Sequence, residues 1–339
     1  MIKVEHLTKC YGDFMAVDDL SFEIDEGHVY GFLGPNGAGK STTMNIMTGC
    51  LSATEGKITI GGHDIFEDPE TAKKLIGYLP EQPPLYMNET PLEYLQFVGE
   101  AKGIKGAELR RQIETVIEQT GIAHVKNRLI STLSKGYKQR VGVAQALLGN
   151  PKVIILDEPT VGLDPIQIIE IRDLIRKLGE THTVILSSHI LSEVQAICEQ
   201  VLIISKGKLV AFDTPENLEK VLTQSSGIHF TVQASLENTQ QILQEMENVE
   251  AFECIDREDG SVAVHVTAGA DELRETGCKL FFAFAKKGLP IFEMTSRKAS
   301  LEDVFIELTE STAQSTASQS TEKETSAEKA REESEVAKG

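Results

Sequence analysis

Short stretches of alternating apolar and polar residues occupy the first part of the chain. Residues 2–5 and 20–25 alternate in this way, with glycine-containing turns at 12–13 and 26–27. Alternation with a period of two predicts β-strands that bury one face. Residues 29–33 are mostly apolar and lead into a glycine-rich loop, which is followed by a helical pattern over 40–49. This order predicts a strand, a loop and a helix in succession.

Two almost continuously apolar runs lie further along, at 153–156 and 183–186. Such runs are typical of strands that are covered on both faces, as in a parallel sheet. A helical pattern over 166–179 between them completes a strand-helix-strand unit. Upstream, Thr90, Pro91 and Glu93 have the spacing of a capping box, and the pattern from there to about residue 149 is helical.

The pattern changes after about residue 225. The predicted order is β-α-β-β-α-β, as in small ferredoxin-like domains, with strands at 228–232, 249–255, 262–267 and 290–295 and helices at 236–247 and 271–287. A further capping-box pattern beginning at Ser300 predicts a last amphipathic helix.

Beyond about residue 311 the chain is rich in Ser, Thr, Glu, Ala and Lys and has no aromatic residue. This composition predicts a disordered acidic tail. We therefore expect three parts: a first domain at 1–222, an accessory α+β domain at 225–310 and the tail at 311–339.

Charge and composition exclude several classes of protein. The chain carries 33 Lys and Arg residues against 52 Asp and Glu, a formal net charge of −19. A nucleic-acid-binding protein needs a cationic surface for phosphates, so nucleic acid is not expected as a partner. No run of 18 apolar residues and no signal peptide is visible. The five cysteines lie far apart without a C-x-x-C pair, which favours free thiols in a reducing cytosol.

Residues 34–41 fit G-x-x-x-x-G-K-[ST] in full, between a predicted strand and a predicted helix. Glycines let the backbone curl around a phosphate, and the helix N-terminus adds a positive dipole. Lys40 would neutralise the β- and γ-phosphates, and the Ser41 hydroxyl can ligate Mg²⁺. A glycine-rich turn without a ligand is the disfavoured alternative. The predicted nucleotide contacts are Gly34, Pro35, Asn36, Gly37, Ala38, Gly39, Lys40, Ser41 and Thr42.

The apolar run at 153–156 ends in two carboxylates, Asp157 and Glu158. Asp157 can hold Mg²⁺ through water, and Glu158 is placed to polarise an attacking water. Two solvated acids at a strand end are the alternative, which is disfavoured when a buried strand directs them toward a nucleotide.

With these residues the sequence resembles the ATP-binding subunits of ABC transporters over about residues 2–220. The further motifs that carry the resemblance are the signature segment LSKGYKQR at 133–140, a Q-loop with Gln82, a D-loop GLDP with Asp164, the switch His189, and Tyr11 at the adenine-stacking position. Their order along the chain is more specific than any one motif. The resemblance implies a P-loop NTPase fold with a parallel-sheet core, an antiparallel β subdomain and a helical subdomain.

The resemblance also implies a composite ATPase site. Two subunits would pair head-to-tail, as a homodimer or with a related chain, so that two ATP molecules lie between the phosphate loop of one subunit and Ser134 and Gly136 of the other. Glu158 would be the general base, and His189 would orient the γ-phosphate and the water. Gln82 would contact both Mg²⁺ and the attacking water.

The signature departs from the family pattern at two positions. Lys135 and Tyr137 replace the more usual Gly and Gln, whereas the phosphate-facing Ser134 and Gly136 are retained. A solvent-facing Lys135 is the preferred interpretation, and a cation added near the site is the alternative.

The signature, the segment at 300–305 and the accessory domain resemble subunits that serve ABC-2 type exporters. This implies a separate integral membrane permease as partner and a location at the cytoplasmic face of the cell membrane. The accessory domain could dock the permease, regulate the pair or support dimerisation. The alternative is a soluble ABC ATPase of DNA repair or ribosome work, which the single ATPase domain and the lack of a long coiled coil disfavour. A regulator without catalysis is opposed by Glu158 and His189.

Overall fold

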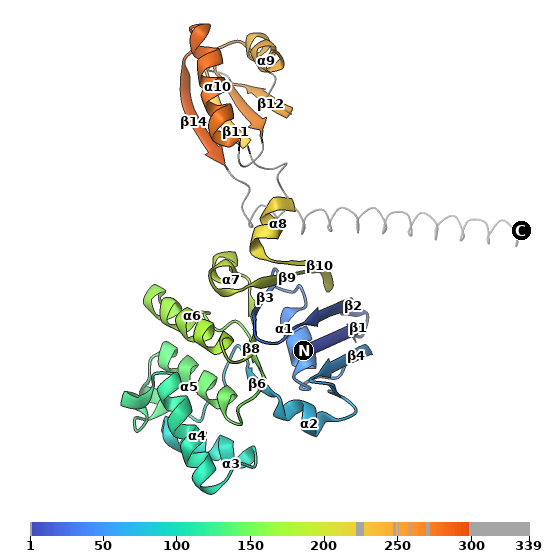
Figure 1. The fold of residues 1–339 in the computed structure, drawn as a ribbon, viewed down its shortest axis with the longest axis vertical. Coiled ribbons are helices and arrows are strands. Elements are labelled where there is room, and N and C mark those ends of the chain that lie inside the picture. Colours follow the sequence, from blue (N-terminus) through green and yellow to red (C-terminus); the bar gives the residue numbers. More distant parts are fainter. Residues whose placement is uncertain are drawn as a thin grey trace, which may run out of the picture. The chain divides into compact units, whose positions relative to one another are not determined.

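The computed structural model describes residues 2–221, 227–246, 249, 251–257, 259–268 and 272–297. The chain divides into two compact units, residues 1–215 and residues 216–339. The first unit contains two sheets with their helices, and the second contains one sheet with helices (Figure 1). The predicted domain ranges 1–222 and 225–310 stay predictions, because residues 222–226 and 298–310 lie outside the described part.

A six-stranded sheet forms the centre of the first unit (Figure 1). Its strands lie in the order β10 (Lys208–Asp213), β9 (Gln200–Ser205), β3 (Val29–Leu33), β8 (Thr183–Ser188), β7 (Val153–Leu156) and β6 (Ile76–Leu79). All pairs are parallel except that of β10 with β9 at the edge. Every residue of β7 and β8 is buried, which confirms the prediction that these two strands are covered on both faces, and β3 is buried throughout as well.

An antiparallel sheet packs against this centre. Its strands lie in the order β2 (Phe14–Ile24), β1 (Ile2–Tyr11), β4 (Glu55–Ile60) and β5 (His63–Asp64). The alternating residues of β1 and β2 turn one face inward, where the rings of Phe22 and Phe32 meet edge to face with centroids 5.4 Å apart. The helix α1 (Lys40–Met47) adds Met44 and Met47, which are fully buried in the same core.

The other helices of the first unit are α2 (Pro69–Lys74), α3 (Pro91–Ala101), α4 (Gly106–Gln119), α5 (Lys135–Leu147), α6 (Pro165–Gly179) and α7 (Leu191–Ile197), with 3₁₀ turns at Ala123–Val125 and Ile130–Thr132. The helix α8 (Pro215–Val221) lies at the boundary between the two units. The predicted capping box of α3 is confirmed: Thr90 Oγ1 accepts from the Glu93 N–H, and the Glu93 carboxylate accepts from the Thr90 N–H. α3, α4 and α5 pack together as the helical subdomain.

The second unit has the predicted β-α-β-β-α-β order. Its elements are β11 (Gly227–Val232), α9 (Leu236–Gln244), β12 (Ala251–Asp256), β13 (Val262–Thr267), α10 (Leu273–Lys286) and β14 (Ile291–Arg297). The sheet is antiparallel throughout, in the order β12-β13-β11-β14. Phe284 of α10 is fully buried against Phe230 of β11. The predicted fold class is therefore confirmed, whereas the helix expected from Ser300 and the tail lie outside the described residues.

Candidate nucleotide-binding and hydrolysis site

The loop between β3 and α1 requires glycine at several positions, because of its backbone conformation and the close approach of neighbouring strands. Gly37 and Gly39 have φ of 81° and 103°, in the left-handed region that favours glycine. A Cβ on Gly39 would lie 2.6 Å from the Ala16 carbonyl oxygen, and one on Gly34 would lie 2.4 Å from the Ile204 carbonyl oxygen. A side chain at either glycine would therefore push the loop off its neighbouring strands.

Lys40 begins α1 with its side chain buried at the base of this loop. Its ammonium Nζ donates to the Gly34 carbonyl at 2.8 Å and lies 3.6 Å from Oε1 of Glu158. The side chain is only 6% exposed, so the charge is compensated locally by these oxygens. The structure thus holds a desolvated cation in the loop, which is the environment in which an anionic ligand is bound most strongly.

The carboxyl ends of β7 and β8 bring the acidic residues to the same place. Asp157 follows β7, and its Oδ1 accepts from Ser41 Oγ at 3.3 Å and from Ser187 Oγ at 2.5 Å. Ser187, near the end of β8, also accepts the backbone N–H of Glu158 at 2.8 Å. Because β7 and β8 are parallel neighbours, both strands deliver polar groups to one edge of the sheet.

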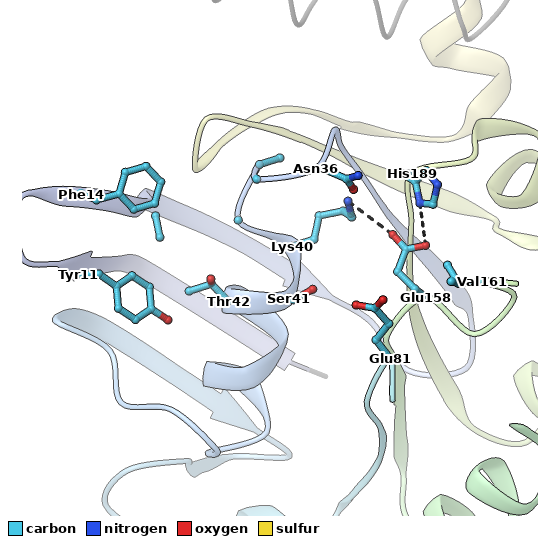
Figure 2. A pocket seen from close by; sticks show the side chains of 14 residues that line it. Tyr11, Phe14, Asn36, Lys40, Ser41, Thr42, Glu81, Glu158, Val161 and His189 are labelled. Carbon is cyan, nitrogen blue, oxygen red and sulfur yellow. Dashed lines mark hydrogen bonds and ion pairs between the residues drawn. The ribbon is translucent and has the colours of Figure 1, made fainter. Parts of the chain in front are cut away.

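Glu158 is held in an unusual backbone conformation. Its φ is 47°, in the left-handed region that a residue with a Cβ rarely adopts. The side chain is nearly buried, and its Oε2 lies 3.0 Å from Nδ1 of His189 while Oε1 faces Lys40 (Figure 2). A carboxylate of low exposure is tolerated here because a lysine and a histidine both face it.

Lys40, Glu158 and His189 line one open cavity of about 440 Å³, a size that suits a small-molecule ligand, whereas Asp157 lies outside its lining. In Figure 2 the phosphate-loop residues lie between Tyr11 and Phe14 on one side and Glu158 and His189 on the other. The aromatic pair flanks a tight turn at the end of β1 and the start of β2 and is exposed at the cavity. The lining residues are Tyr11, Phe14, Ala16, Asn36, Gly37, Ala38, Gly39, Lys40, Ser41, Thr42, Glu81, Glu158, Val161 and His189.

Glu81, rather than the predicted Gln82, lines this cavity. Both side chains are exposed, but the Glu81 carboxylate points toward Ser41 and Glu158 (Figure 2). The strand register explains the difference: Leu79 of β6 pairs with Leu156 of β7, so Glu81 stands at the same distance past its strand as Glu158 does past β7. The sequence alone does not show this, because it depends on the register of β6 against β7.

The signature residues lie outside the cavity. Ser134 is the N-cap of α5 and accepts the Tyr137 N–H at 3.4 Å, whereas Asp164 is the N-cap of α6 and accepts the Gln167 N–H at 2.9 Å. A Cβ on Gly136 would lie 2.7 Å from the Gln167 side chain. Signature and D-loop are therefore adjacent to one another within the chain, and none of Ser134, Gly136 and Asp164 lines the phosphate-loop cavity.

Lys135 also lies at this junction. Its Nζ is 2.1 Å from the position that a Cβ on Gly162 would occupy, so the lysine extends over the D-loop glycine. Gly162 has a φ of 70°, in the left-handed region that favours glycine, whereas the flexible end of Lys135 could move aside for a side chain. Lys135 is nevertheless exposed, in keeping with the solvent-facing interpretation, and its ammonium end passes over Gly162.

Comparison with known proteins places the chain in a family. Residues 17–161 match the model of the family described as "ABC transporter". The bacitracin transport ATP-binding protein BcrA of Bacillus licheniformis is 36% identical over 311 residues, which cover 91% of this chain and 97% of that protein. The chain belongs to the ATP-binding subunits of ABC transporters. It is an ATP-binding, ATP-hydrolysing subunit, and the predicted likeness to the subunits of ABC-2 type exporters is confirmed over the soluble alternative.

Other relatives extend the comparison. The lantibiotic transport ATP-binding protein SrtF of Streptococcus pyogenes is 38% identical over 65% of this chain and 95% of its own length. The linearmycin resistance ATP-binding protein LnrL of Bacillus subtilis is 36% identical over 68% of this chain and 75% of its own. A solved dimeric ATP-binding cassette bound to ADP and Pi covers 63% of this chain with a TM-score of 0.57 and 28% identity.

Within the described residues, no helix has both the length and the apolar character needed to cross a membrane. The five cysteines carry free thiols, as the sequence predicts.

Proposed function

We propose that this subunit hydrolyses magnesium-ATP at the phosphate-loop cavity and drives a separate membrane permease that exports antibiotics. The observation that carries the hydrolytic part is the convergence of Lys40, Ser41, Glu158 and His189 on one cavity, with Asp157 hydrogen-bonded to Ser41 beneath it. Export and substrate class rest on the relatives that are named for bacitracin, lantibiotic and linearmycin.

Each cavity residue has a role that follows from its position. The Glu158 carboxylate accepts the proton of the attacking water, and His189 beside it orients that water and the γ-phosphate. Lys40 and the loop N–H groups neutralise the phosphates, and Tyr11 stacks on the adenine ring. Substitution of Glu158 by Gln keeps the shape and removes the base, so we expect kcat to fall by about 100-fold or more with ATP affinity retained. Unchanged turnover would contradict the assignment.

The oxygen donors that the structure brings together fit a Mg²⁺ site. Ser41 Oγ and Asp157 Oδ1 lie 3.3 Å apart, and the Glu81 carboxylate points toward Ser41 (Figure 2). Mg²⁺ favours one or two protein oxygens together with the nucleotide phosphates, and when bound it neutralises charge on the transferred phosphoryl group. We propose Glu81 as the Q-loop side chain on the metal side, in place of Gln82.

The two neighbouring Q-loop residues offer a matched experiment. Glu81→Ala should raise the Mg²⁺ concentration needed for half-maximal binding of a fluorescent ATP analogue by about 10-fold, because a carboxylate oxygen is lost. Gln82→Ala serves as the control and should change it by less than about twofold. The reverse outcome would restore Gln82 as the metal-side residue. Mn²⁺ binding followed by electron paramagnetic resonance gives a readout that does not depend on turnover.

A second copy of the chain would complete the site. Ser134, Gly136 and Asp164 lie outside the cavity, so one subunit does not supply both halves. The helix N-terminus at Ser134 is a ready anion site, and a head-to-tail homodimer would place it on the γ-phosphate of the partner's ATP. The Glu158→Gln variant should form an ATP-dependent dimer in size-exclusion chromatography. A variant that binds ATP and stays monomeric at all concentrations would refute the pairing.

The permease would dock beside the Q-loop. An aromatic cluster lies there, in which the Tyr86 ring is 5.3 Å from the exposed Phe97 and 5.7 Å from the buried Tyr94. Tyr86 and Phe97 are 50% and 52% exposed, and contiguous apolar surface of this kind marks protein contacts. Through this partner the subunit would lie at the cytoplasmic face of the membrane. Phe97→Ser should abolish co-purification with the permease and leave the ATPase activity of the free subunit unchanged.

A further inference from the structure

A buried polar network lies behind the cavity and is separate from its lining. At its centre is Glu193, in the first turn of α7, whose side chain is 3% exposed. Its Oε2 accepts two hydroxyl donors, Thr160 Oγ1 at 2.5 Å and Ser188 Oγ at 3.1 Å. The Ser188 hydroxyl oxygen in turn accepts the Ile190 N–H at 3.0 Å.

The two hydroxyl groups come from the two segments that carry the Glu158–His189 pair. Thr160 lies two residues beyond Glu158, and Ser188 directly precedes His189. Thr160 and Ser188 are 33 and 5 positions from Glu193 along the chain, so the carboxylate joins the distant segment after β7 to the segment that directly precedes α7. His189 is therefore flanked on both sides by residues of this network, since Ile190 follows it.

Burying a carboxylate is costly unless its oxygens are well hydrogen-bonded. The two hydrogen bonds to one carboxylate oxygen also restrict where the backbone of each donor residue can lie, because a hydrogen bond weakens steeply when it is lengthened or bent. Thr160, Ser188 and Glu193 are each at most 5% exposed, so water has little access to replace a lost bond. The network thus limits how far the segment after β7 can separate from the segment after β8.

We propose that Glu193 is a positioning residue for ATP hydrolysis. It touches neither nucleotide nor attacking water, and acts by holding Thr160 and Ser188 so that His189 stays within reach of Glu158. This inference rests on the proposed roles of Glu158 and His189. It predicts that loss of Glu193 lowers turnover through the Glu158–His189 geometry and leaves the phosphate loop, and hence nucleotide affinity, intact.

The first experiment compares kcat with the affinity for a fluorescent ATP analogue. Glu193→Ala should lower kcat by about 10-fold with affinity changed less than about twofold, as expected when catalytic groups shift by a fraction of an ångström. Glu193→Gln retains an oxygen that accepts both hydroxyls, so it should recover most of the lost kcat. Equal losses in the Ala and Gln variants would overturn the hydrogen-bonding role.

Smaller changes cover the case in which Glu193→Ala fails to fold. Thr160→Val is nearly isosteric and removes one arm of the network. Its matched control is Thr120→Val, which removes another buried hydroxyl, bonded to the Val116 carbonyl at 2.6 Å in the helical subdomain. Thr160→Val should lower kcat severalfold, and the control should leave it unchanged. If both variants lower kcat equally, the effect is general destabilisation and the inference is wrong.

A double-mutant cycle separates this inference from the proposed catalytic roles. If Glu193 acts through His189, Glu193→Ala should cost about 10-fold in the native chain and less than about twofold in a His189→Ala background. The same loss in both backgrounds would overturn the inference while leaving the role of His189 in place. If His189→Ala by itself leaves kcat unchanged, the proposed role of His189 fails instead.

Discussion

Ser187 connects the two acidic residues of the site, and its removal gives the sharpest test of how the site is held. The side chain is fully buried, accepts the Glu158 N–H at 2.8 Å and donates to Asp157 Oδ1 at 2.5 Å. Ser187→Ala leaves the buried N–H unpaired, which costs about 1–3 kcal/mol, and removes a bond to a carboxylate worth about 1.5–3 kcal/mol. Because the two bonds share one hydroxyl, the losses are not additive, and we expect about 3 kcal/mol in total.

The same change should weaken catalysis. Glu158 is in the left-handed region at a φ of 47°, a conformation that persists only where the surroundings hold it. Without the Ser187 acceptor, the backbone at Glu158 can relax and carry the carboxylate away from His189. We therefore expect kcat to fall by about 10-fold or more.

A second hydroxyl on the same strand provides the control. Thr183, at the start of β8, is buried and accepts the Gly27 N–H at 3.0 Å, remote from the cavity. Thr183→Val should cost about 1–2 kcal/mol and leave kcat unchanged. Stability of the first unit can be measured by thiol labelling of the buried Cys198 at increasing urea. The reasoning is refuted if Ser187→Ala is no more destabilising than the control and hydrolyses ATP at the native rate.

Three further predictions concern charge and burial. Lys40→Met should lower ATP affinity by about 10- to 100-fold in calorimetry, since charge-assisted bonds to the phosphates are lost; unchanged affinity would contradict the phosphate-loop assignment. Burial lowers the pKa of Lys102 to about 8. Between this pKa and the usual lysine value, the unfolded chain therefore binds more protons than the folded one. The free energy of unfolding of the native chain should then rise above pH 8 relative to that of Lys102→Met, and a fall relative to the variant would contradict the prediction. Burial also raises the pKa of the Cys198 thiol, so a thiol reagent at neutral pH should label the exposed Cys50 and Cys278 quickly and Cys198 only on unfolding.

Local chemistry made much of the fold predictable from sequence. The helix starts at Thr90 and Ser134 were predictable because an N-cap depends on residues within one turn. The strands β7 and β8 were predictable because burial on both faces requires nearly continuous apolar residues. The phosphate loop is likewise a local feature, since its glycines, lysine and serine are adjacent in the chain.

Contacts between distant segments were decided by the tertiary structure. The sequence by itself determined that Gly34–Ser41 forms a phosphate loop and that two carboxylates follow a buried strand. Only the register of β6 against β7 placed Glu81 rather than Gln82 at the cavity, and only the pairing of β7 with β8 brought Ser187 to Asp157 and Glu158. The hydroxyl of Thr160 meets Glu193, 33 positions further along the chain, for the same reason. A hydrogen bond depends on the distance between two atoms, and for residues tens of positions apart that distance is determined by how the strands pack.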